Sequence, residues 1–445
     1  MPPSSETPGP EAVVARSGEA DRGARPKVAY LFTRFPWPTE TFLQREIEGL
    51  VALGFRPDLY SFHGGGGVFC GLPVRRVSKW RLLQLLWLGP VAALRDPDFV
   101  LPLARRLFVE WPRDWMNHWE NLYGGGIAVV LAGAFRRAGY THLHGVWASF
   151  PAMAAWVLAR FTGASFSFGA HAYDLFEYGG DWLLREKAAG AAFIHTSTCA
   201  GERRLRALGV PKEKIQLARR GLARWHEAVD RGAVGDPLRI ICVARLVPKK
   251  GLVRQVRLYA ALKRRGFRLS VKIVGDGPLR PELEREIRTV GVEREVRLLG
   301  ALPQPAVWAE LARADVLVHT GEVTRSGDRD GLPNVVPEAM AAGALVITTP
   351  AEGVCEAIAD GETGFVRRID DPDAWAECLT AITHDRALCR RVRRAARAWV
   401  EANFDARKNA ALLLERFRQA AATPPANGFE AMGQPGSGEN DDVVL

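Results

Sequence analysis

The stretch Asp330-Gly-Leu-Pro-Asn-Val-Val-Pro-Glu-Ala-Met-Ala-Ala-Gly343 decides how its part of the chain folds. It follows an apolar run, residues 314–319, that is typical of a buried strand, and it predicts a short helix ending at Gly343. Pro337 has no backbone N–H, so it must lie in the first turn of this helix. The free N–H groups of the helix are therefore expected just past the strand, where parallel α/β sheets bind phosphate groups.

Two acids frame this stretch. Glu338 lies one turn inside the predicted helix, where a carboxylate can accept two hydrogen bonds from the diol of a ribose. Asp330 lies eight residues upstream, in the loop before the helix, where it can meet sugar hydroxyls. The spacing alone is a weak signal, because two acids eight residues apart are common. The Gly-Leu-Pro before Glu338 and the Ala-Met-Ala-Ala-Gly after it make the signal specific.

This stretch resembles the Glu-x7-Glu motif of retaining glycosyltransferases of the GT-B type, especially family 4, although the family usually has Glu where this chain has Asp330. The resemblance implies that Glu338 holds the ribose of a nucleotide-sugar donor and that Asp330 contacts the donor sugar. It also implies a donor-binding segment made of Gly331, Leu332, Pro333, Asn334 and Val335.

A second motif, Arg245-Leu-Val-Pro-Lys-Lys-Gly251, follows the first strand of the second half and resembles the family's Arg-Leu-x-x-x-Lys-Gly. Two cations five residues apart on such a loop can both reach a diphosphate, Arg as a planar fork and Lys as a point charge. We assign this role to Arg245 and to Lys250, which directly precedes the glycine. The alternative is that Lys249 and Lys250 are ordinary surface lysines.

Two further segments resemble the nucleotide side of the family. Gly275-Asp-Gly-Pro278 follows the next strand and is similar to the family's Gly-x-Gly-Pro turn, which implies donor contacts at Gly275 and Gly277. A tight turn that needs glycine backbone angles explains the same residues and is expected in either case. Leu299, in the strand and loop of residues 297–301, corresponds to the segment that usually borders the base.

The first half of the chain carries weaker motifs. Phe35-Pro-Trp-Pro-Thr-Glu-Thr-Phe42 follows the first strand and resembles the opening of exopolysaccharide-type enzymes of the family, but an ordinary capped loop explains it equally well. Residues 165–174 end in His171-Ala-Tyr-Asp, which is similar to a family motif whose His lies at the donor sugar. That role is carried to His171, whereas His144 is interpreted as structural or acceptor-side. Arg220-Gly221 departs from the Asn-Gly that the family often shows.

The second half alternates strands and helices, which predicts a doubly wound parallel sheet. The first half is similar, so the expected fold class is α/β of GT-B type: two Rossmann-like domains that face each other across a cleft. The predicted organisation is a disordered tail over 1–26, an acceptor-side domain over 27–227, a linker near 228–236, a nucleotide-sugar domain over 237–403, a helix over 404–422 that crosses back to the first domain, and a disordered tail over 423–445.

Composition limits the other possibilities. The chain has 445 residues and a formal charge of +10, which favours anionic partners such as nucleotides or anionic lipid surfaces. The six cysteines form no Cys-x-x-Cys pair, so neither a zinc site nor a disulfide framework is indicated, and a cytoplasmic location is expected. Residues 1–26 lack the apolar core of a signal peptide. The longest apolar run, residues 82–94, is too short for a membrane span.

Residues 72–120 are unusual because they contain five tryptophans, at positions 80, 87, 111, 115 and 119, together with several arginines. One interpretation is a set of helices packed in the N-terminal domain, which the usual burial of tryptophan favours. The other is an interfacial surface where tryptophan and arginine meet lipid headgroups, which would give peripheral contact with the inner face of an anionic membrane.

A metal site is not expected. Asp328-Arg-Asp330 has the Asp-x-Asp pattern of the other glycosyltransferase fold, GT-A, but two more such triplets occur at residues 96–98 and 371–373. Asp330 also already belongs to the acid-x7-acid frame. We therefore expect no metal and no other cofactor beside the nucleotide-sugar substrate.

The resemblance as a whole implies a retaining glycosyltransferase that moves a sugar from a nucleotide-sugar to a hydroxyl of a glycan or lipid-linked acceptor, in exopolysaccharide or cell-surface polysaccharide synthesis. The implied catalytic residues are Arg245, Lys250, His171 and Asp330. Two alternatives remain: a GT-B-fold nucleotide-sugar epimerase, and a non-catalytic protein that binds polyanions through its positive charge. Nucleic acid is not an expected partner of the glycosyltransferase.

Overall fold

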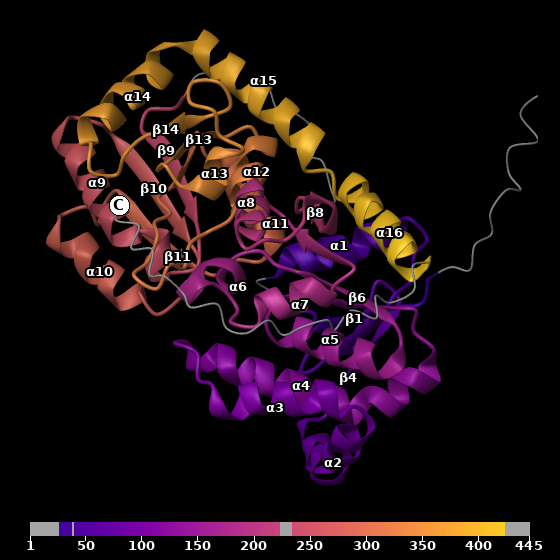
Figure 1. Ribbon diagram of the computed structural model, residues 1–445. Helices are drawn as coiled ribbons and strands as arrows, with labels where there is room; N and C mark the ends of the chain where they lie inside the picture. The colour runs from indigo at the N-terminus through magenta and orange to yellow at the C-terminus, as the bar shows by residue number, and fades with distance from the viewer. Residues whose placement is uncertain (1–25, 38–39, 223–233, 423–445) are drawn as a thin grey trace, which may run out of the picture.

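A computed structural model of the chain describes residues 26–37, 40–222 and 234–422, which form two α/β domains and a pair of C-terminal helices (Figure 1). The predicted tail over 423–445, nearly all of the tail over 1–26 and most of the predicted linker near 228–236 lie outside these residues. No helix among the described residues is long and apolar enough to span a membrane.

The N-terminal domain is built on an eight-stranded sheet in the order β3-β4-β2-β1-β5-β6-β7-β8. All neighbouring strands are parallel except the edge pair β3 and β4. The strands are β1 (Val28–Phe32), β2 (Asp58–Ser61), β3 (Gly67–Phe69), β4 (Leu72–Arg76), β5 (His142–Gly145), β6 (Ser165–Gly169), β7 (Phe193–Thr196) and β8 (Ile215–Leu217). The helices are α1 (Thr41–Ala52), α2 (Leu85–Arg95), α3 (Pro97–Val109), α4 (Trp115–Ala138), α5 (Phe150–Thr162), α6 (Tyr173–Phe176), α7 (Leu184–Gly190) and α8 (Cys199–Ala207).

The C-terminal domain contains a six-stranded parallel sheet in the order β11-β10-β9-β12-β13-β14, which reverses direction between β9 and β12. This is the strand order of a doubly wound fold, and ligands bind at such a reversal. The strands are β9 (Leu238–Val243), β10 (Leu269–Val274), β11 (Val296–Gly300), β12 (Val316–His319), β13 (Leu345–Thr348) and β14 (Phe365–Val366). The helices are α9 (Leu252–Arg264), α10 (Arg280–Thr289), α11 (Gln304–Arg313), α12 (Val335–Ala341), α13 (Glu352–Cys355), α14 (Pro372–His384) and α15 (Arg386–Asn403).

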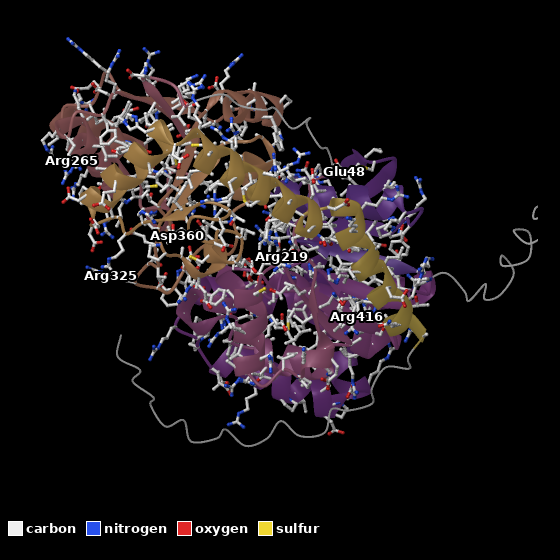
Figure 2. The ribbon with its side chains drawn as sticks, turned by 90° about the horizontal axis from the view of Figure 1, so that it is seen from above. Glu48, Arg219, Arg265, Arg325, Asp360 and Arg416 are labelled. Atoms are coloured by element: carbon white, nitrogen blue, oxygen red, sulfur yellow. The ribbon has the colours of Figure 1, made fainter. Side chains whose placement is uncertain are left out.

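The final helix, α16 (Ala406–Ala422), returns to the N-terminal domain. In Figures 1 and 2, α15 lies along the C-terminal domain and α16 along the N-terminal domain. The turn between them is fixed by a hydrogen bond of 2.6 Å from the Leu222 backbone N–H to the Phe404 carbonyl. A β-carbon added to Gly49 of α1 would lie 2.8 Å from the Ala410 side chain, so the glycine allows α1 and α16 to approach closely.

Residues 72–120 form helices packed in the N-terminal domain, as one interpretation expected, but the expected burial of their five tryptophans is wrong. Helices α2, α3 and α4 form, but these tryptophans are 51% to 72% exposed. The reason is the helical period: Trp115 and Trp119 are one turn apart on one face of α4, whereas the opposite face buries Asn117, Asn121 and Ile127. The three helices lie at the bottom of Figure 1, on the side of the N-terminal domain away from α15.

Candidate active site

The acid-x7-acid stretch begins in the loop after β12 and continues through α12, beside the strand at which the sheet reverses its direction. Helix α12 begins at Val335, so Pro337 falls in its first turn as expected. The Glu338 backbone N–H donates to the Asn334 carbonyl at 3.1 Å, which is the first hydrogen bond of the helix. The stretch faces the N-terminal domain, because a β-carbon on Gly331 would lie 3.5 Å from the carbonyl oxygen of His171.

Asp330 is held as a charged group. Its Oδ2 accepts a hydrogen bond of 2.6 Å from Lys250 Nζ and lies 3.3 Å from His319 Nε2. Burial acts to raise the pKa of Asp330, but the positive charge of Lys250 and the hydrogen bond with His319 outweigh it and hold the pKa well below its usual value. The structure thus brings together two of the implied catalytic residues, Asp330 and Lys250.

Glu338 forms a contact between the domains that the sequence does not reveal. Its Oε1 accepts hydrogen bonds from Arg45 of α1, at 2.5 Å, and from Gln304 Nε2, at 3.1 Å. Burial raises the pKa of Glu338, while Arg45 acts to lower it. Within the described residues Oε2 has no hydrogen bond, so this oxygen is the one open to a ligand. The role of Glu338 toward a ribose stays a prediction.

Arg245 and Lys249 are positioned differently from Lys250. Arg245 is exposed after β9, and its guanidinium has no hydrogen bond or ion pair with any other described residue. Lys249 is buried and pairs with Asp328 at 2.9 Å. Both carboxylates of the Asp-x-Asp triplet therefore face a lysine. The assignment of the diphosphate to Arg245 and Lys250 stays a prediction, and the geometry leaves Arg245 available for it.

His171 follows β6 and is 2% exposed. Asp174 positions its loop by accepting hydrogen bonds from the backbone N–H groups of His171 and Ala172, at 3.0 and 2.8 Å. Burial, followed by the charges of His195 and Arg220, holds the pKa of His171 well below its usual value, so the ring is neutral. Its Nδ1 is buried and has no hydrogen-bond partner among the described residues, which is unusual for a buried polar atom.

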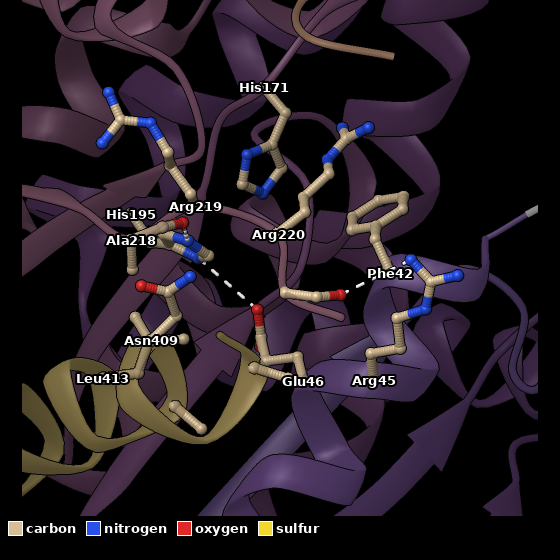
Figure 3. Close-up of a pocket in the computed structure, with 13 residues that line it drawn as sticks. Phe42, Arg45, Glu46, His171, His195, Ala218, Arg219, Arg220, Asn409 and Leu413 are labelled. Carbon is tan, nitrogen blue, oxygen red and sulfur yellow. Dashed lines mark hydrogen bonds and ion pairs between the residues drawn. The ribbon is translucent and has the colours of Figure 1, made fainter. Parts of the chain in front are cut away.

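Arg220 is a candidate that sequence reasoning missed. Its guanidinium lies 3.9 Å from the centre of the Phe42 ring, and burial lowers its pKa to about 10 although Asp330 and Glu40 oppose that change. Figure 3 shows Arg220 beside His171 and Phe42 at a small cavity of about 20 Å³. The available signal is the departure from Asn-Gly at this position.

Glu40 is a second missed candidate, from the Phe-Pro-x-x-Thr-Glu-Thr-Phe motif. It precedes α1, and burial raises its pKa to about 7, although a hydrogen bond with Trp147 and the charges of Arg220 and Arg245 act to lower it. Because the charge of Arg245, in the other domain, affects the pKa of Glu40, this carboxylate lies at the junction between the domains. The motif pointed to this loop, but its spacing assigned no role to the acid.

The glycine turn after β10 supports the Arg245 loop. A β-carbon on Gly275 would lie 1.8 Å from the Ala244 carbonyl oxygen, and one on Gly277 would lie 2.6 Å from the Leu246 carbonyl oxygen. Only glycine allows this approach, and both residues have positive φ. Leu299 lies on the neighbouring strand, β11. Donor contacts of Gly275, Gly277 and Leu299 stay predictions.

One group among the described residues has side chains close enough to suggest a metal. Ligand atoms of Glu46, His144 and His195 lie within 4.8 Å of one another. Each already has a partner: Tyr30 donates to Glu46 at 3.0 Å, His144 Nδ1 lies 2.8 Å from the Ser167 hydroxyl, and His195 Nε2 lies 2.8 Å from the Ala218 carbonyl. Burial raises the pKa of Glu46 to about 7 and lowers that of His195 to about 4. The charge of Arg220 acts to lower both pKa values, so it opposes a cation there as well.

Comparisons with known proteins agree with this geometry. Residues 224–399 match a family described as glycosyl transferases group 1. The amylovoran biosynthesis glycosyltransferase AmsK of Erwinia amylovora is 33% identical over 219 residues, 48% of this chain and 54% of AmsK. The putative colanic acid biosynthesis glycosyltransferase WcaL of Salmonella typhimurium is 35% identical over 188 residues, 41% of this chain and 46% of WcaL. The matched region thus spans about half the length of these relatives.

A solved structure extends the likeness to both domains. Anabaena HepE in complex with UDP and glucose has a TM-score of 0.62 at 15% identity, over 88% of this chain and 100% of that one. At this identity the likeness shows the fold, and it confirms the expected GT-B architecture of two Rossmann-like domains. Residues 224–399 thus match the group 1 glycosyl transferases, and the chain as a whole has the GT-B fold.

Proposed function

We propose that the protein is a retaining glycosyltransferase that moves a sugar from a nucleotide-sugar to a hydroxyl of a glycan or lipid-linked acceptor. The observation that carries this proposal is the pair of Lys250, from the loop after β9, and Asp330, from the loop before α12. Gly331 of the second loop lies against His171 of the other domain. The names of AmsK and WcaL, and the UDP and glucose bound by HepE, support a nucleotide-sugar donor and a place in exopolysaccharide synthesis.

Each residue of the site is proposed to have a separate role. Arg245 and Lys250 neutralise the leaving diphosphate, because fixed cations stabilise charge that develops in the transition state. Glu338 Oε2 binds the ribose, while Asp330 and the neutral ring of His171 bind hydroxyls of the donor sugar. We place no covalent nucleophile at the site, and propose that the acceptor attacks on the same face that the leaving phosphate vacates. The diphosphate then accepts the proton of the acceptor hydroxyl.

The exposed tryptophans support a location at a membrane. Trp80, Trp87, Trp111, Trp115 and Trp119 are all more than half exposed on one helical layer. Tryptophan favours the boundary between lipid and water, and arginine binds anionic headgroups. We propose that the protein is cytoplasmic and binds the inner face of the cell membrane peripherally.

A screen of nucleotide-sugars by thermal shift tests the proposal. We expect one nucleotide-sugar to raise the melting temperature and to be hydrolysed slowly without an acceptor, with release of a sugar that initially keeps the configuration of the donor in the NMR spectrum. An initial product of inverted configuration would contradict the retaining mechanism. A C2 epimer recovered still attached to its nucleotide would instead identify an epimerase. Binding to polyanions without any binding of nucleotide-sugars would contradict the whole proposal.

A further inference from the structure

A pocket of about 390 Å³ lies between the start of α4 and the segment that follows α6. It is separate from the residues discussed above. Six of its lining residues carry the argument: Arg113, Asp114, Tyr178, Trp182, Arg185 and Arg204. The pocket is large enough for a phosphate or diphosphate group together with part of a sugar.

The lining has a surplus of positive charge. Within the described residues, the guanidinium groups of Arg113, Arg185 and Arg204 form no ion pair with a carboxylate. Arg204 is held by the carbonyls of residues 175 and 179, at 3.2 and 2.6 Å. Burial lowers the pKa of Arg204, and the charges of Arg329 and Arg185 lower it further. Arginines that repel one another in this way are stabilised by an anion between them.

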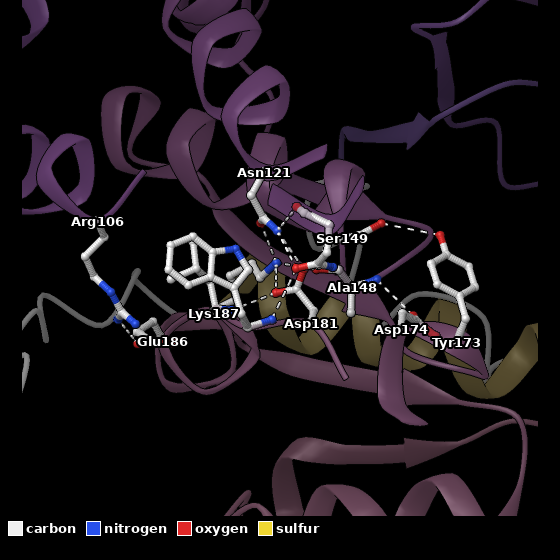
Figure 4. Close-up of polar contacts among 12 residues, drawn as sticks. Arg106, Asn121, Ala148, Ser149, Tyr173, Asp174, Asp181, Glu186 and Lys187 are labelled. Atoms are coloured by element: carbon white, nitrogen blue, oxygen red, sulfur yellow. Dashed lines mark hydrogen bonds and ion pairs between the residues drawn. The ribbon is translucent and has the colours of Figure 1, made fainter. Parts of the chain in front are cut away.

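The two acids in the lining do not neutralise these arginines. Asp114 caps α4 by accepting from the Met116 backbone N–H at 2.9 Å. Asp181 is buried, pairs with the buried Lys187 at 2.5 Å, and accepts from Asn117 at 3.0 Å. Figure 4 shows Asp181, Lys187 and Asn121 joined in one network, of which Asp181 lines the pocket. This network holds Asn117 and Asp181, which line the pocket, in fixed positions.

The pocket lies beside the candidate active site. The backbone N–H of Tyr178 donates to the carbonyl of Ser326 at 2.7 Å, and the Ser326 hydroxyl donates to Glu177 at 3.0 Å. Ser326 belongs to the loop that carries Asp330 four residues later. A molecule in the pocket can therefore extend past Tyr178 toward the junction between the domains.

The pocket is also continuous with the exposed tryptophan surface. The ring of Trp111 stacks on His118 at 4.5 Å, and His118 lies 6.1 Å from Trp182, which lines the pocket. Trp111 and Trp115 are 67% and 62% exposed. An apolar surface of this kind on one side of a cationic pocket, with the active site on the other, fits a ligand that has a hydrocarbon chain, a phosphate and a sugar in that order.

We propose that this pocket binds the phosphate groups of a lipid-linked acceptor, with the lipid against the tryptophan surface and the acceptor sugar directed to the active site. This inference rests on the proposed function, which requires an acceptor, and it names the chemical class of that acceptor. Arg113 and Arg185 bind the phosphate oxygens, while Arg204, held by backbone carbonyls, positions the pocket wall.

Binding of farnesyl diphosphate and of inorganic pyrophosphate, measured by calorimetry on the full chain, tests the proposal. The double variant Arg113→Gln/Arg185→Gln should bind farnesyl diphosphate at least 10-fold more weakly, because two charge-assisted contacts are lost. The control Arg386→Gln/Arg390→Gln loses the same charge on exposed residues of α15, and should bind as the unmodified protein does. Equal affinities of the two double variants would overturn the proposal.

The variant Trp115→Ala distinguishes binding of a lipid-linked phosphate from binding of a free phosphate. It should weaken binding of farnesyl diphosphate and leave binding of pyrophosphate unchanged. Pyrophosphate that binds as tightly as farnesyl diphosphate would overturn the lipid assignment. Slow hydrolysis of the nucleotide-sugar should be the same in Arg113→Gln/Arg185→Gln and in the unmodified protein. Absence of that hydrolysis from the unmodified protein would instead contradict the proposed function, so the two failures are distinguishable.

Discussion

At the scale of single residues, three carboxylates of the candidate site are each paired with a cationic side chain. Asp330 pairs with Lys250, Glu338 with Arg45, and Asp328 with Lys249. Motif spacing predicted Asp330 and the helix that carries Glu338. It could not predict Arg45, because the pair joins positions 293 residues apart in two domains and no local pattern records such a contact.

Glu338→Gln should weaken donor binding. The substitution keeps the shape of the side chain but weakens charge-assisted hydrogen bonds worth about 1.5–3 kcal/mol each, so donor affinity should fall roughly 10- to 100-fold. Calorimetry with the donor found by the screen measures this. Arg45→Gln is the control, because it removes the partner and keeps the carboxylate; it should lower the melting temperature without a comparable loss of donor affinity. Unchanged affinity in Glu338→Gln would remove Glu338 from the site.

Glu46 gives a prediction about pH. Burial raises its pKa from 4.5 to about 7, while the Tyr30 hydrogen bond and Arg220 act to lower it. Between these values the unfolded chain loses the proton before the folded protein does, so this residue destabilises the fold as pH rises. Glu46→Gln does not ionise, so its stability relative to the unmodified protein should increase between pH 5 and pH 8, by at most about 3 kcal/mol.

Urea unfolding at the two pH values measures this difference. Glu415→Gln is the control for the substitution itself, because it makes the same change at a side chain that is 57% exposed. A Glu46→Gln effect that is equal at pH 5 and pH 8 would show that Glu46 is already ionised at pH 5.

At the scale of elements, the contact between α1 and α16 ties the C-terminal helix to the N-terminal domain. Gly49→Ala should destabilise the protein by about 1–3 kcal/mol, because the new β-carbon would lie 2.8 Å from Ala410 and 2.9 Å from the Ala406 carbonyl. Gly133→Ala is the matched control in α4, where the new β-carbon meets only the end of the Arg137 side chain, at 3.6 Å. It should stabilise the protein by up to about 1 kcal/mol through helix propensity. Thermal unfolding compares the two, and a stabilising Gly49→Ala would contradict the close packing of α1 and α16.

Helices α2, α3 and α4 give the prediction about membranes. The protein should co-sediment with vesicles of phosphatidylglycerol at low salt and less at high salt, because headgroup attraction is screened. Trp111→Ala/Trp115→Ala should reduce the bound fraction, whereas Leu412→Ala, an exposed apolar residue of α16, should not. Failure of the unmodified protein to bind at low salt would leave the tryptophan surface without a lipid partner.

The same helices show where sequence patterns reach their limit. The alternation of strands and helices predicted the sheet of the C-terminal domain, because its central strands β12 and β13 are mostly apolar and β10 alternates apolar with polar residues. The composition of residues 72–120 left two interpretations, because tryptophan is apolar enough for a core and amphipathic enough for a surface. Only the position of Trp115 and Trp119 relative to the neighbouring helices decides between them.

At the scale of the whole molecule, the site depends on residues from both domains. The stretch 330–343 comes from the C-terminal domain, whereas His171, Glu40 and Arg220 come from the N-terminal domain. The sequence could predict the strand ends that carry these residues. It could not predict which strand ends face each other, because that depends on the packing of one domain on the other.

The charge that a diphosphate develops must be neutralised by the assembled molecule. GT-A enzymes use a divalent cation held by Asp-x-Asp, but here both acids of the triplet face lysines. We therefore predict that turnover survives EDTA. Arg245→Ala and Lys250→Ala should each reduce turnover by about two to three orders of magnitude, since each removes a group that stabilises the leaving charge.

Asp328→Ala separates the two mechanisms. It leaves the buried Lys249 without its partner, so the melting temperature should fall, but turnover below that temperature should change little because Asp328 contacts neither Arg245 nor Lys250. In a metal-dependent enzyme, by contrast, Asp328→Ala would remove a ligand and act like EDTA. The contrary outcome has three parts: EDTA abolishes turnover, Asp328→Ala abolishes it too, and added Mg²⁺ or Mn²⁺ restores it only in the unmodified protein. These results would make the triplet a metal site. They would also remove Arg245 and Lys250 as the groups that neutralise the diphosphate.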